Sequence, residues 1–322
     1  MTDRPLRVGV VGVGYLGGLH AAKYAALDSA ELVGVCDSDR GRAAEVAAAN
    51  GCAAFDAPAE LAAAVDALSI AVPTAAHEAV AVAAIEGGVD VLVEKPLAAT
   101  IAEAERIAGA AARHGRLLQI GHLERFHPAL AEARQVVGRP RFIECHRLAP
   151  FAGRGADVSV VQDVMIHDLD LLASLVGEPV VSVEAIGVSV LSEHVDLANA
   201  RLRFRGGCVA NVTASRVSLK RERRLRVFQP EAYVAIDFDA HRLLVARLPE
   251  GAREAGGNPM ESIELDQRDY DDADPLAEEL AAFVAAVSTR GDVQVGPDEA
   301  IAAMRLATDI EEAIAEAAQD GA

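Results

Sequence analysis

The sequence predicts an α/β protein: an N-terminal Rossmann domain with a doubly wound parallel sheet, then a C-terminal α+β domain with a large open mixed or antiparallel sheet. Three observations support this prediction. Short β-branched runs alternate with alanine-rich stretches as far as Gly121, a glycine-rich turn follows the first run, and several strand-like runs come in succession after Gly121. Strand–helix alternation gives parallel sheets, whereas successive strands give antiparallel or mixed ones. We therefore expect two domains, residues 1–121 and 122–322.

Five apolar runs in the first domain are predicted strands covered on both faces, because they lack the polar alternation of a half-exposed strand. These strands are Leu6–Val13, Glu31–Cys36, Ala67–Val72, Val89–Val93 and Leu117–Ile120. The alanine-rich stretches between them are predicted helices, over Gly18–Leu27, Gly41–Asn50, Ala75–Glu86 and Ile101–His114. Thr100 and Glu103 have the spacing of a capping box at the start of the last helix.

The second domain begins with a predicted helix, strand and helix, at His127–Val137, Arg141–Leu148 and Val161–Val176. Strand-like runs without helices between them follow at Val180–Val190, Asp196–Phe204, Cys208–Ser215, Arg223–Phe228, Tyr233–Phe238 and Leu243–Arg247. The Gly206-Gly207 pair between two of these runs is a hairpin signal. Gly251–Asn258 is a predicted loop, and two further helices are expected at Asp274–Thr289 and Pro297–Ala318.

The composition argues against several classes of protein. The formal net charge of −19 opposes binding to phosphate backbones, so we expect no nucleic-acid partner. No apolar run reaches the ~20 residues that a membrane-spanning helix needs, so we expect no insertion into a membrane. The four cysteines lack C-x-x-C spacing, which indicates a reducing, cytoplasmic setting rather than a disulfide framework or a structural zinc site.

A predicted strand runs into a G-x-G-x-x-G turn and then a helix. In Gly12-Val13-Gly14-Tyr15-Leu16-Gly17, the first glycine allows a tight turn, the second lets the backbone approach a pyrophosphate, and the third lets helix and strand pack closely. The helix N-terminus offers N–H groups and a positive dipole to phosphates. The turn, with Tyr15 and Leu16, is therefore a predicted dinucleotide site; the alternative is a glycine-rich turn beside a helix-capping aspartate.

Asp37 follows the second predicted strand at the distance from the turn that dinucleotide-binding proteins use. A carboxylate there accepts hydrogen bonds from the adenosine ribose and repels a 2′-phosphate, which favours NAD over NADP. Arg40 lies close by in the sequence and has the opposite tendency, since it would attract a 2′-phosphate. We expect NAD to be the cofactor.

Two segments carry the chemistry of a proton transfer. Glu94-Lys95-Pro96 ends the fourth of these runs at the sheet edge where ligands bind, so Lys95 is placed to reach a substrate hydroxyl; the alternative is a solvated lysine. Asp163 and His167 have i, i+4 spacing on one helical face. A carboxylate that holds one ring nitrogen suits His167 as a general base; the alternative is a surface pair.

Other polar residues have weaker patterns. His77 is a predicted cofactor contact. The histidines His122, His127 and His167 would have to converge to bind a metal, but no H-E-x-x-H or paired-carboxylate spacing supports this, so no metal is expected. The basic run from Arg216 to Arg226 is either a site for a substrate phosphate or a solvated strand.

Taken together, Gly12–Gly17, Val72-Pro73-Thr74 with His77, Glu94-Lys95-Pro96 and Asp163…His167 resemble the Gfo/Idh/MocA family of oxidoreductases over essentially the whole chain. The resemblance implies hydride transfer between a sugar carbon and the nicotinamide of NAD. It implies that Lys95 and His167 serve proton transfer at the sugar hydroxyl and that Asp163 supports His167. It also adds Pro73, Thr74, Glu94 and Lys95 to the cofactor site.

Within the family, residues 121–128, 161–172 and 215–238 look like members that oxidise C3 of UDP-N-acetylglucosamine in lipid A diamino-sugar synthesis. His127 departs from the small polar residue expected at its position. Candidates for binding the substrate are Lys95, Arg125, Arg147, Arg154, His167 and Lys220. The resemblance also implies a homodimer or homotetramer packed through the strands of Val180–Arg247.

Two other functions remain open at this point. One is oxidation of a free sugar or an inositol-type polyol. The other, from a different class, is a non-catalytic NAD-binding regulator on the same fold, which would need neither Lys95 nor the Asp163/His167 pair.

Overall fold

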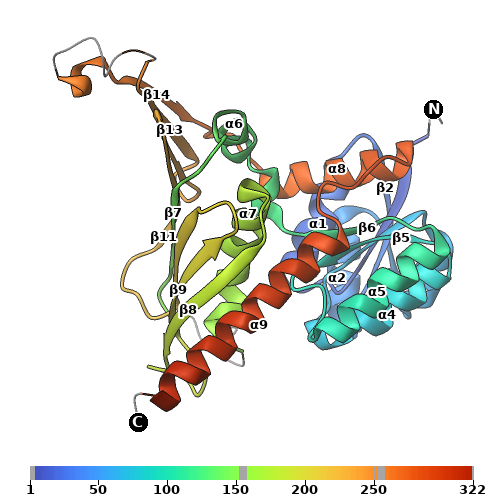
Figure 1. The fold of residues 1–322 in the computed structure, drawn as a ribbon. Coiled ribbons are helices and arrows are strands. Elements are labelled where there is room, and N and C mark those ends of the chain that lie inside the picture. The colour runs from blue at the N-terminus through green and yellow to red at the C-terminus, as the bar shows by residue number, and fades with distance from the viewer. Residues whose placement is uncertain (1–3, 152–157, 250, 252–257, 321–322) are drawn as a thin grey trace. The chain divides into compact units, whose positions relative to one another are not determined.

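The structure is a computed structural model that describes residues 4–151, 158–249, 251 and 258–320. The chain divides into two compact units. Unit 1 comprises Met1–Phe126 and Asp274–Ile301, and unit 2 comprises His127–Ala273 and Ala302–Ala322. Figure 1 labels the elements of both units, which are described one unit at a time.

Unit 1 is a Rossmann fold whose described strands form a six-stranded parallel sheet in the order β3-β2-β1-β4-β5-β6. The strands are β1 (Leu6–Val11), β2 (Ala30–Cys36), β3 (Ala53–Phe55), β4 (Ala67–Ile70), β5 (Asp90–Glu94) and β6 (Leu118–Gly121). The helices between them are α1 (Tyr15–Ala26), α2 (Arg40–Asn50), α3 (Pro58–Ala64), α4 (His77–Glu86) and α5 (Ile101–His114), with short 3₁₀ turns η1 (Thr74–Ala76) and η2 (Leu123–Phe126). The strand order reverses at β1, and ligands bind beside such a switch point. The predicted parallel sheet is confirmed.

Helix α8 (Pro275–Thr289) also belongs to unit 1, although most of unit 2 precedes it in the sequence. Its apolar side chains join the core of β1 and α1: Leu276, Leu280, Phe283, Val284 and Val287 pack with Val8, Val10 and Tyr24. The expected uninterrupted second domain, residues 122–322, is therefore corrected, because residues 274–301 return to unit 1. The apolar periodicity predicts the helix but not the core that it joins.

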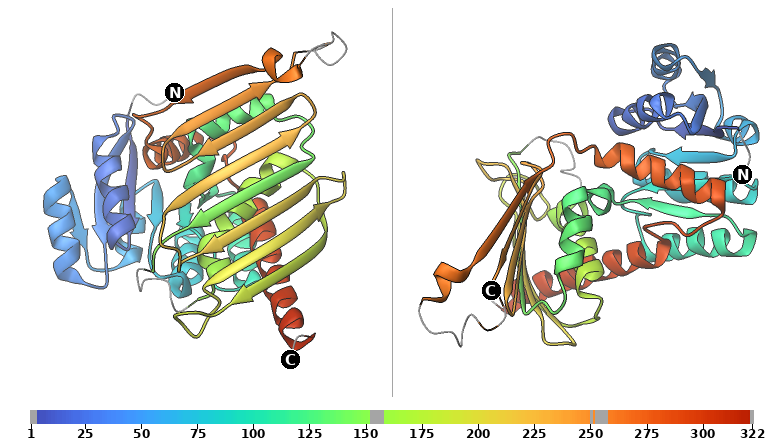
Figure 2. Two further views of the ribbon diagram at one scale, coloured as in Figure 1. Left: turned by 90° about the vertical axis from the view of Figure 1, so that its left-hand side faces the viewer. Right: turned by 90° about the horizontal axis from the view of Figure 1, so that it is seen from above.

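Unit 2 is built on a mixed sheet whose eight described strands have the order β14-β13-β12-β11-β7-β10-β9-β8. The strands are β7 (Phe142–Leu148), β8 (Val180–Val188), β9 (Leu197–Phe204), β10 (Val209–Ser215), β11 (Glu222–Gln229), β12 (Ala232–Asp237), β13 (Arg242–Arg247) and β14 (Glu264–Asp269). Strands β7 and β10 are parallel, and the other neighbouring strands are antiparallel. Figure 2 shows these strands side by side in one broad sheet, as predicted.

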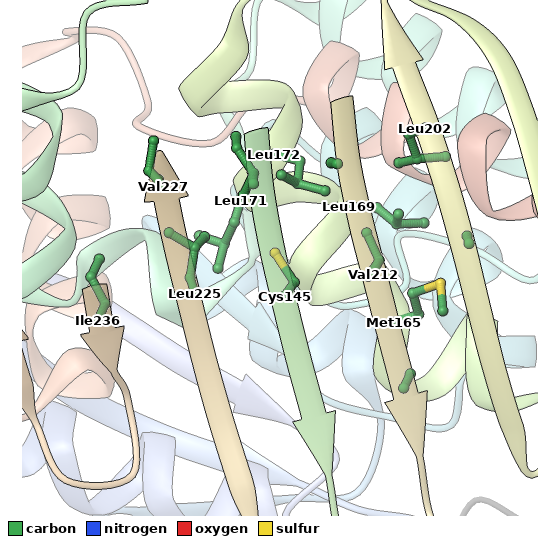
Figure 3. Close-up of a cluster of buried hydrophobic side chains, with 14 of the residues drawn as sticks. Cys145, Met165, Leu169, Leu171, Leu172, Leu202, Val212, Leu225, Val227 and Ile236 are labelled. Carbon is green, nitrogen blue, oxygen red and sulfur yellow. The ribbon is translucent and has the colours of Figure 1, made fainter. Parts of the chain in front are cut away.

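One face of this sheet is covered by α6 (Pro128–Val136), by α7 (Ile166–Val176) and by the part of α9 (Pro297–Asp320) that lies in unit 2 (Figure 2). In Figure 3, α7 and the turn before it point Met165, Leu169 and Leu172 at the strands. The other face keeps apolar side chains exposed, among them Ile186 at 59% and Leu265 at 71%.

Several elements differ from the prediction. The short pair β3 and α3 is not predicted, since three and seven residues are too few for a periodic signal. Strand β14 is not predicted either, because its sequence ELDQRD is charged and exposed, as befits an edge strand. The predicted loop at Gly251–Asn258 falls largely outside the described residues.

A further difference concerns the predicted helix Val161–Val176. Its first turn, Val161–Met165, is a π-helix (η3), and α7 begins only at Ile166. A π turn inserts one residue per turn, and such turns are frequent at functional sites. Helical periodicity alone does not distinguish it from an α-helix. None of the helices in the described residues is long and apolar enough to cross a membrane.

Candidate active site

The glycine-rich turn has the geometry that its sequence predicts. Gly12 has φ of +83°, and a Cβ there would lie 2.7 Å from the backbone of Ala71. A Cβ on Gly17 would lie 1.8 Å from the carbonyl oxygen of Gly12, so α1 can pack against the turn only with glycine at that position. Both positions therefore require glycine.

Gly14 differs from these two glycines because the space beside it is open. The nearest atom to a Cβ at Gly14 would be Nη1 of Arg42, at 3.8 Å. Gly14 is also the N-cap of α1, and no side chain caps the helix there. The turn thus presents open space and a helix N-terminus at one place, which fits the pyrophosphate of a dinucleotide. Next to it, Tyr15 is 76% exposed, while Leu16 packs against the core.

Asp37 ties the turn to the end of β2. Its Oδ2 accepts the backbone N–H of Val13 at 2.8 Å, and its Oδ1 accepts the N–H of Asp39 at 2.8 Å. These bonds hold the carboxylate beside the turn, where the ribose of a dinucleotide would be bound. The fit to NAD therefore rests on both the turn and this carboxylate.

The cation beside Asp37 is Arg42 rather than Arg40. Arg42 Nη1 lies 3.7 Å from Asp37 Oδ2, whereas Arg40 Nε lies 3.3 Å from Asp56. No motif in the sequence singles out Arg42. Arg42 is the third residue after Asp39, the N-cap of α2, and this place in the first helical turn is the signal that points to it.

His77 links the two segments that follow β4 and β5. Its Nε2 lies 2.9 Å from the carbonyl oxygen of Val72, and its Nδ1 lies 3.0 Å from that of Pro96. The ring is buried, so it joins Val72-Pro73-Thr74 to the Lys95-Pro96 segment. This structural role stands beside the predicted cofactor contact, which stays a prediction. The Lys95–Pro96 peptide bond is cis.

The acid–base candidates of unit 2 lie where the π turn meets α7. Asp163 is in the π turn and His167 is the second residue of α7. Both are half-buried, whereas Val161, Met165 and Leu169 are buried against the sheet. The chain thus turns its apolar side toward the sheet and leaves the Asp163 and His167 positions on the more exposed side.

Helix α9 anchors this π turn. Glu311 accepts hydrogen bonds from the hydroxyl of Ser159 and, at 2.8 Å, from Nε2 of Gln162. The N–H of Val160 also donates to the carbonyl oxygen of Val195 at 2.8 Å. These bonds fix the segment that leads into Asp163, so neighbouring elements hold the start of the turn in place.

The predicted substrate contacts are spread over the two units. Arg125 lies in η2 of unit 1 and is buried. Arg147 lies in β7 of unit 2, buried in a two-bond pair with Asp168 at 2.9 and 3.2 Å. Lys220 lies in unit 2, exposed and paired with Glu222. Arg154 is outside the described residues. The structure therefore does not gather these side chains into one site within either unit.

The basic run after Arg216 is a set of ion pairs. Arg216 Nε lies 2.7 Å from Asp196, and Arg224 Nη2 lies 3.0 Å from Asp237. The other basic residues of the run also face carboxylates: Lys220 faces Glu222, Arg221 and Arg223 face Asp239, and Arg226 faces Glu144. Their charges are thus compensated within unit 2, which favours the interpretation as a solvated strand.

His127 caps α6 by accepting the N–H of Ala129 at 3.1 Å through Nδ1. Its Nε2 lies 3.0 Å from Nδ1 of His241. The three histidines weighed as metal ligands do not all belong to one unit, since His122 is in unit 1 and His127 and His167 are in unit 2.

Comparison with known proteins finds similarity over most of the chain. Residues 6–122 match the NAD-binding Rossmann fold of the Gfo/Idh/MocA oxidoreductase family, and residues 132–234 match a C-terminal domain of that family. The UDP-N-acetylglucosamine 3-dehydrogenase of Acidithiobacillus ferrooxidans is 42% identical over 292 residues, 89% of this chain and 90% of that protein. Its solved structure superposes with a TM-score of 0.89 over 97% of this chain and 98% of that one, at 38% identity.

Inositol dehydrogenases are also similar, over less of the chain or at lower identity. Inositol 2-dehydrogenase 4 of Saccharopolyspora erythraea is 36% identical over 57% of each chain. The scyllo-inositol dehydrogenase of Lactobacillus casei, solved with NAD(H) and scyllo-inositol, has a TM-score of 0.81 over 97% of this chain and 98% of that one, but 21% identity. The latter supports the fold alone.

Proposed function

Because the chain belongs to the Gfo/Idh/MocA family of NAD-binding oxidoreductases, we propose that it oxidises a secondary hydroxyl of a nucleotide sugar, at C3 of UDP-N-acetylglucosamine. The observation that carries this proposal is the 42% identity to a UDP-N-acetylglucosamine 3-dehydrogenase over 89% of the chain. A free polyol is the second candidate, supported by inositol 2-dehydrogenases that match 57% of the chain. The retained Lys95, Asp163 and His167 favour an enzyme over a regulator.

The cofactor site supports binding of NAD. The turn at Gly12–Gly17 would hold the pyrophosphate, Asp37 the adenosine ribose, and the Pro73–Thr74 and Lys95 segments the nicotinamide end. When bound, NAD accepts the hydride that leaves the sugar carbon. Asp37 would repel the 2′-phosphate of NADP.

Three side chains would divide the work of removing the hydroxyl proton. His167 takes the proton, because imidazole is the side chain best matched to neutral pH. Asp163 holds the ring in the right tautomer. Lys95 stabilises the developing alkoxide by charge and a hydrogen bond, as donors in an oxyanion hole do. These roles come from the family resemblance.

The proposal extends to the setting of the enzyme. We propose that the 3-keto product enters lipid A diamino-sugar synthesis and that the protein is cytoplasmic, which its free cysteines support. We also propose a homodimer or homotetramer through the unit 2 sheet. The exposed apolar side chains Val181, Ile186 and Leu265 support this assembly, since water is a poor solvent for such a surface.

A substrate panel tests the proposed reaction. Purified protein with NAD is mixed separately with UDP-N-acetylglucosamine, UDP-glucose, myo-inositol and scyllo-inositol, and NADH formation is followed by absorbance. We expect kcat/KM to be highest for UDP-N-acetylglucosamine, with a product lighter by two hydrogens in mass spectrometry. Preference for an inositol would establish the second candidate, and no turnover of any of them with NAD bound would favour the regulator.

A further inference from the structure

Three ionisable side chains that the proposed mechanism does not use meet inside unit 1. His20 comes from α1, Glu94 ends β5, and Glu279 comes from α8. One nitrogen or oxygen of each lies within 4.8 Å of the others, and all three residues are buried, with His20 and Glu279 at 0% exposure. We call these residues the buried triad. Burying such groups is costly unless they are paired or hydrogen-bonded.

The groups of the triad face one another without making conventional hydrogen bonds. His20 Nε2 lies 3.1 Å from Glu94 Oε1. Among the described residues, neither ring nitrogen of His20 and neither carboxyl oxygen of Glu279 has a hydrogen-bond partner. Native proteins rarely leave buried polar groups unsatisfied, so these atoms call for a partner within the triad or beside it. A single proton shared among the three side chains would supply the missing hydrogen-bond donor.

Electrostatics favours the Glu279 side of the triad as the place of that proton. Burial raises the pKa of Glu279 well above its usual value, and the nearby charges of Glu94 and Glu124 raise it further. Two carboxyl groups this close in a buried site cannot both ionise cheaply. A protonated Glu279 gains an O–H donor for its neighbours.

Other polar groups lie close to the triad. On α1, Tyr24 is buried and its hydroxyl bonds to Ser69, with a pKa raised by burial. On β6, the Nε2 group of Gln119 donates to the backbone carbonyl of Glu279 at 3.2 Å. Of the nearby titratable groups, Tyr24 interacts electrostatically with Glu94 and Glu279, and Glu124 interacts electrostatically with Glu279.

Glu94 connects the triad to the next residue, Lys95. Glu94 Oε2 accepts the backbone N–H of Lys95 at 3.3 Å. The carboxyl group also occupies space that a glycine leaves open, since a Cβ on Gly121 would lie 2.7 Å from Glu94 Oε1. A side chain larger than hydrogen at Gly121 would displace this carboxyl group, so the place of the Glu94 carboxyl group is defined from several sides.

We propose that His20 and Glu279 are positioning residues for Lys95: with a proton shared in the buried triad, they hold the Glu94 carboxyl group, which in turn holds the Lys95 backbone. The inference rests on the proposed role of Lys95 in the oxidation. The triad acts through Glu94 and does not contact the substrate.

Two substitutions of Glu279 test this proposal. Glu279→Gln keeps an uncharged group that can still donate a hydrogen bond, whereas Glu279→Leu removes it. We expect Glu279→Gln to keep kcat within about twofold and Glu279→Leu to lose about tenfold or more, because small misplacements of a reacting group are costly. Glu278→Gln, an exposed neighbour on α8, is the matched control and should keep the kcat of the unmodified protein.

The pH profile separates positioning from a merely structural role. As pH rises, the unmodified triad loses its proton and acquires a second negative charge, so kcat should fall at alkaline pH. The Gln variant cannot lose that proton, so this part of the alkaline decline in kcat should be absent from its profile. Equal profiles for the two proteins, or a Leu variant with undiminished kcat, would overturn the proposal. A Leu variant that also loses about tenfold in NAD affinity and melts at a clearly lower temperature would overturn it too, because a general loss of structure would then explain the lower kcat.

A measurement without substrate keeps this inference separate from the proposed function. The rate at which an amine-reactive label modifies Lys95 is followed by mass spectrometry, with the exposed Lys220 of unit 2 as internal reference. We expect the Lys95-to-Lys220 ratio to change at least about twofold in Glu279→Leu and to stay unchanged in Glu279→Gln. An unchanged ratio in the Leu variant contradicts positioning, whatever the substrate panel shows.

Metal analysis addresses the other occupant that this chemistry would accept. Histidine and carboxylates also bind divalent cations such as Zn²⁺. The protein, purified without chelators, is analysed for zinc and manganese. We expect less than about 0.1 metal ion per chain, well short of a full structural site. If the protein carries one metal ion per chain and Glu279→Leu loses it, the triad binds a metal and the shared-proton proposal is wrong.

Discussion

We propose that the choice between NAD and NADP depends on Asp37, which then has two tasks. Its carboxylate accepts the Val13 N–H at 2.8 Å and also places a negative charge beside the ribose site. Asp37→Asn keeps an acceptor for the turn but removes the charge. We expect the ratio of NAD to NADP affinity to fall by about tenfold, ~1.4 kcal/mol.

Arg42 supplies the matched control for that prediction. It lies 3.7 Å from Asp37, so in Asp37→Asn it is available to a 2′-phosphate. Adding Arg42→Ala to Asp37→Asn should remove most of the gained NADP affinity, whereas Arg40→Ala should not. Fluorescence titration with both cofactors measures this. An unchanged NAD to NADP ratio in Asp37→Asn would mean that Asp37 serves only the turn.

Asp196 makes the stability of unit 2 depend on pH. Burial would raise its pKa, but the N–H groups of Val190, Leu191 and Ser192 and the guanidinium of Arg216 outweigh it and lower the pKa far below the usual value. A lowered pKa gives stability that is present above the unfolded pKa of about 3.9 and is lost as pH falls toward the folded value.

Asp196→Asn should therefore destabilise the protein by about 3–5 kcal/mol at pH 7, since it leaves Arg216 buried without its charge partner. The difference from the unmodified protein should be constant between about pH 5 and 8 and shrink only below about pH 4. Urea unfolding at several pH values measures it. A difference that instead grew as pH fell would contradict the sign of this assignment.

At the scale of elements, the π turn Val161–Met165 decides how Asp163 and His167 are presented. Glu311 on α9 holds this turn through Ser159 and Gln162. Glu311→Ala should loosen it and lower kcat by about tenfold, because hydrogen bonds to a charged group contribute about 1.5–3 kcal/mol. The NAD dissociation constant should stay the same. Glu312→Ala, at the next and exposed position of α9, is the control. A Glu311→Ala enzyme with full kcat would show that the π turn keeps its structure without the bonds to Glu311.

Elements with a strong local signal could be predicted from the sequence. The Thr100–Glu103 capping box is present in both directions, and the Gly206-Gly207 turn has φ of +87° at Gly207. Elements without such a signal could not. Strand β14 depends on pairing with β13, and the π turn depends on contacts with α9, so both are set by tertiary structure.

In the candidate site, too, the features with a local sequence signal could be predicted and those set by tertiary contacts could not. The tight turn at Gly12 and the lysine after β5 follow from short motifs. His77 as a bridge between carbonyl groups, Arg42 beside Asp37 and the pairing of Arg147 with Asp168 could not be predicted, because each joins segments far apart in the sequence or depends on side-chain direction.

At the scale of the whole molecule, the uncovered face of the unit 2 sheet predicts assembly. Ile186 is 59% exposed on β8 and Leu265 is 71% exposed on β14. We expect a dimer or tetramer by light scattering at micromolar concentration. Ile186→Lys with Leu265→Lys should shift the protein toward monomer, whereas Leu219→Lys, at a fully exposed turn, should not. A monomeric unmodified protein would refute the predicted assembly.

The return of residues 274–301 to unit 1 has a consequence for dissecting the molecule. A fragment that ends near Gly121 lacks α8, whose Leu280 and Phe283 are buried in the unit 1 core. Joining residues 1–126 to 274–301 should give a fragment that binds NAD, whereas residues 1–121 alone should unfold. Circular dichroism and NAD titration of the two fragments measure this. Equal folding of both would contradict the role of α8.

We propose that this chain oxidises a sugar hydroxyl with NAD through Lys95 and His167. The most direct measurement is single-turnover formation of NADH with UDP-N-acetylglucosamine in the unmodified protein, His167→Ala, Lys95→Ala, Lys95→Met and Asp163→Asn, each with its NAD dissociation constant. Since a general base contributes about 10²–10⁴-fold, we expect His167→Ala to lose that much while still binding NAD. Both Lys95 variants should lose at least as much, and Asp163→Asn less, with a shifted pH profile. Near-normal turnover in both His167→Ala and Lys95→Ala would contradict the account.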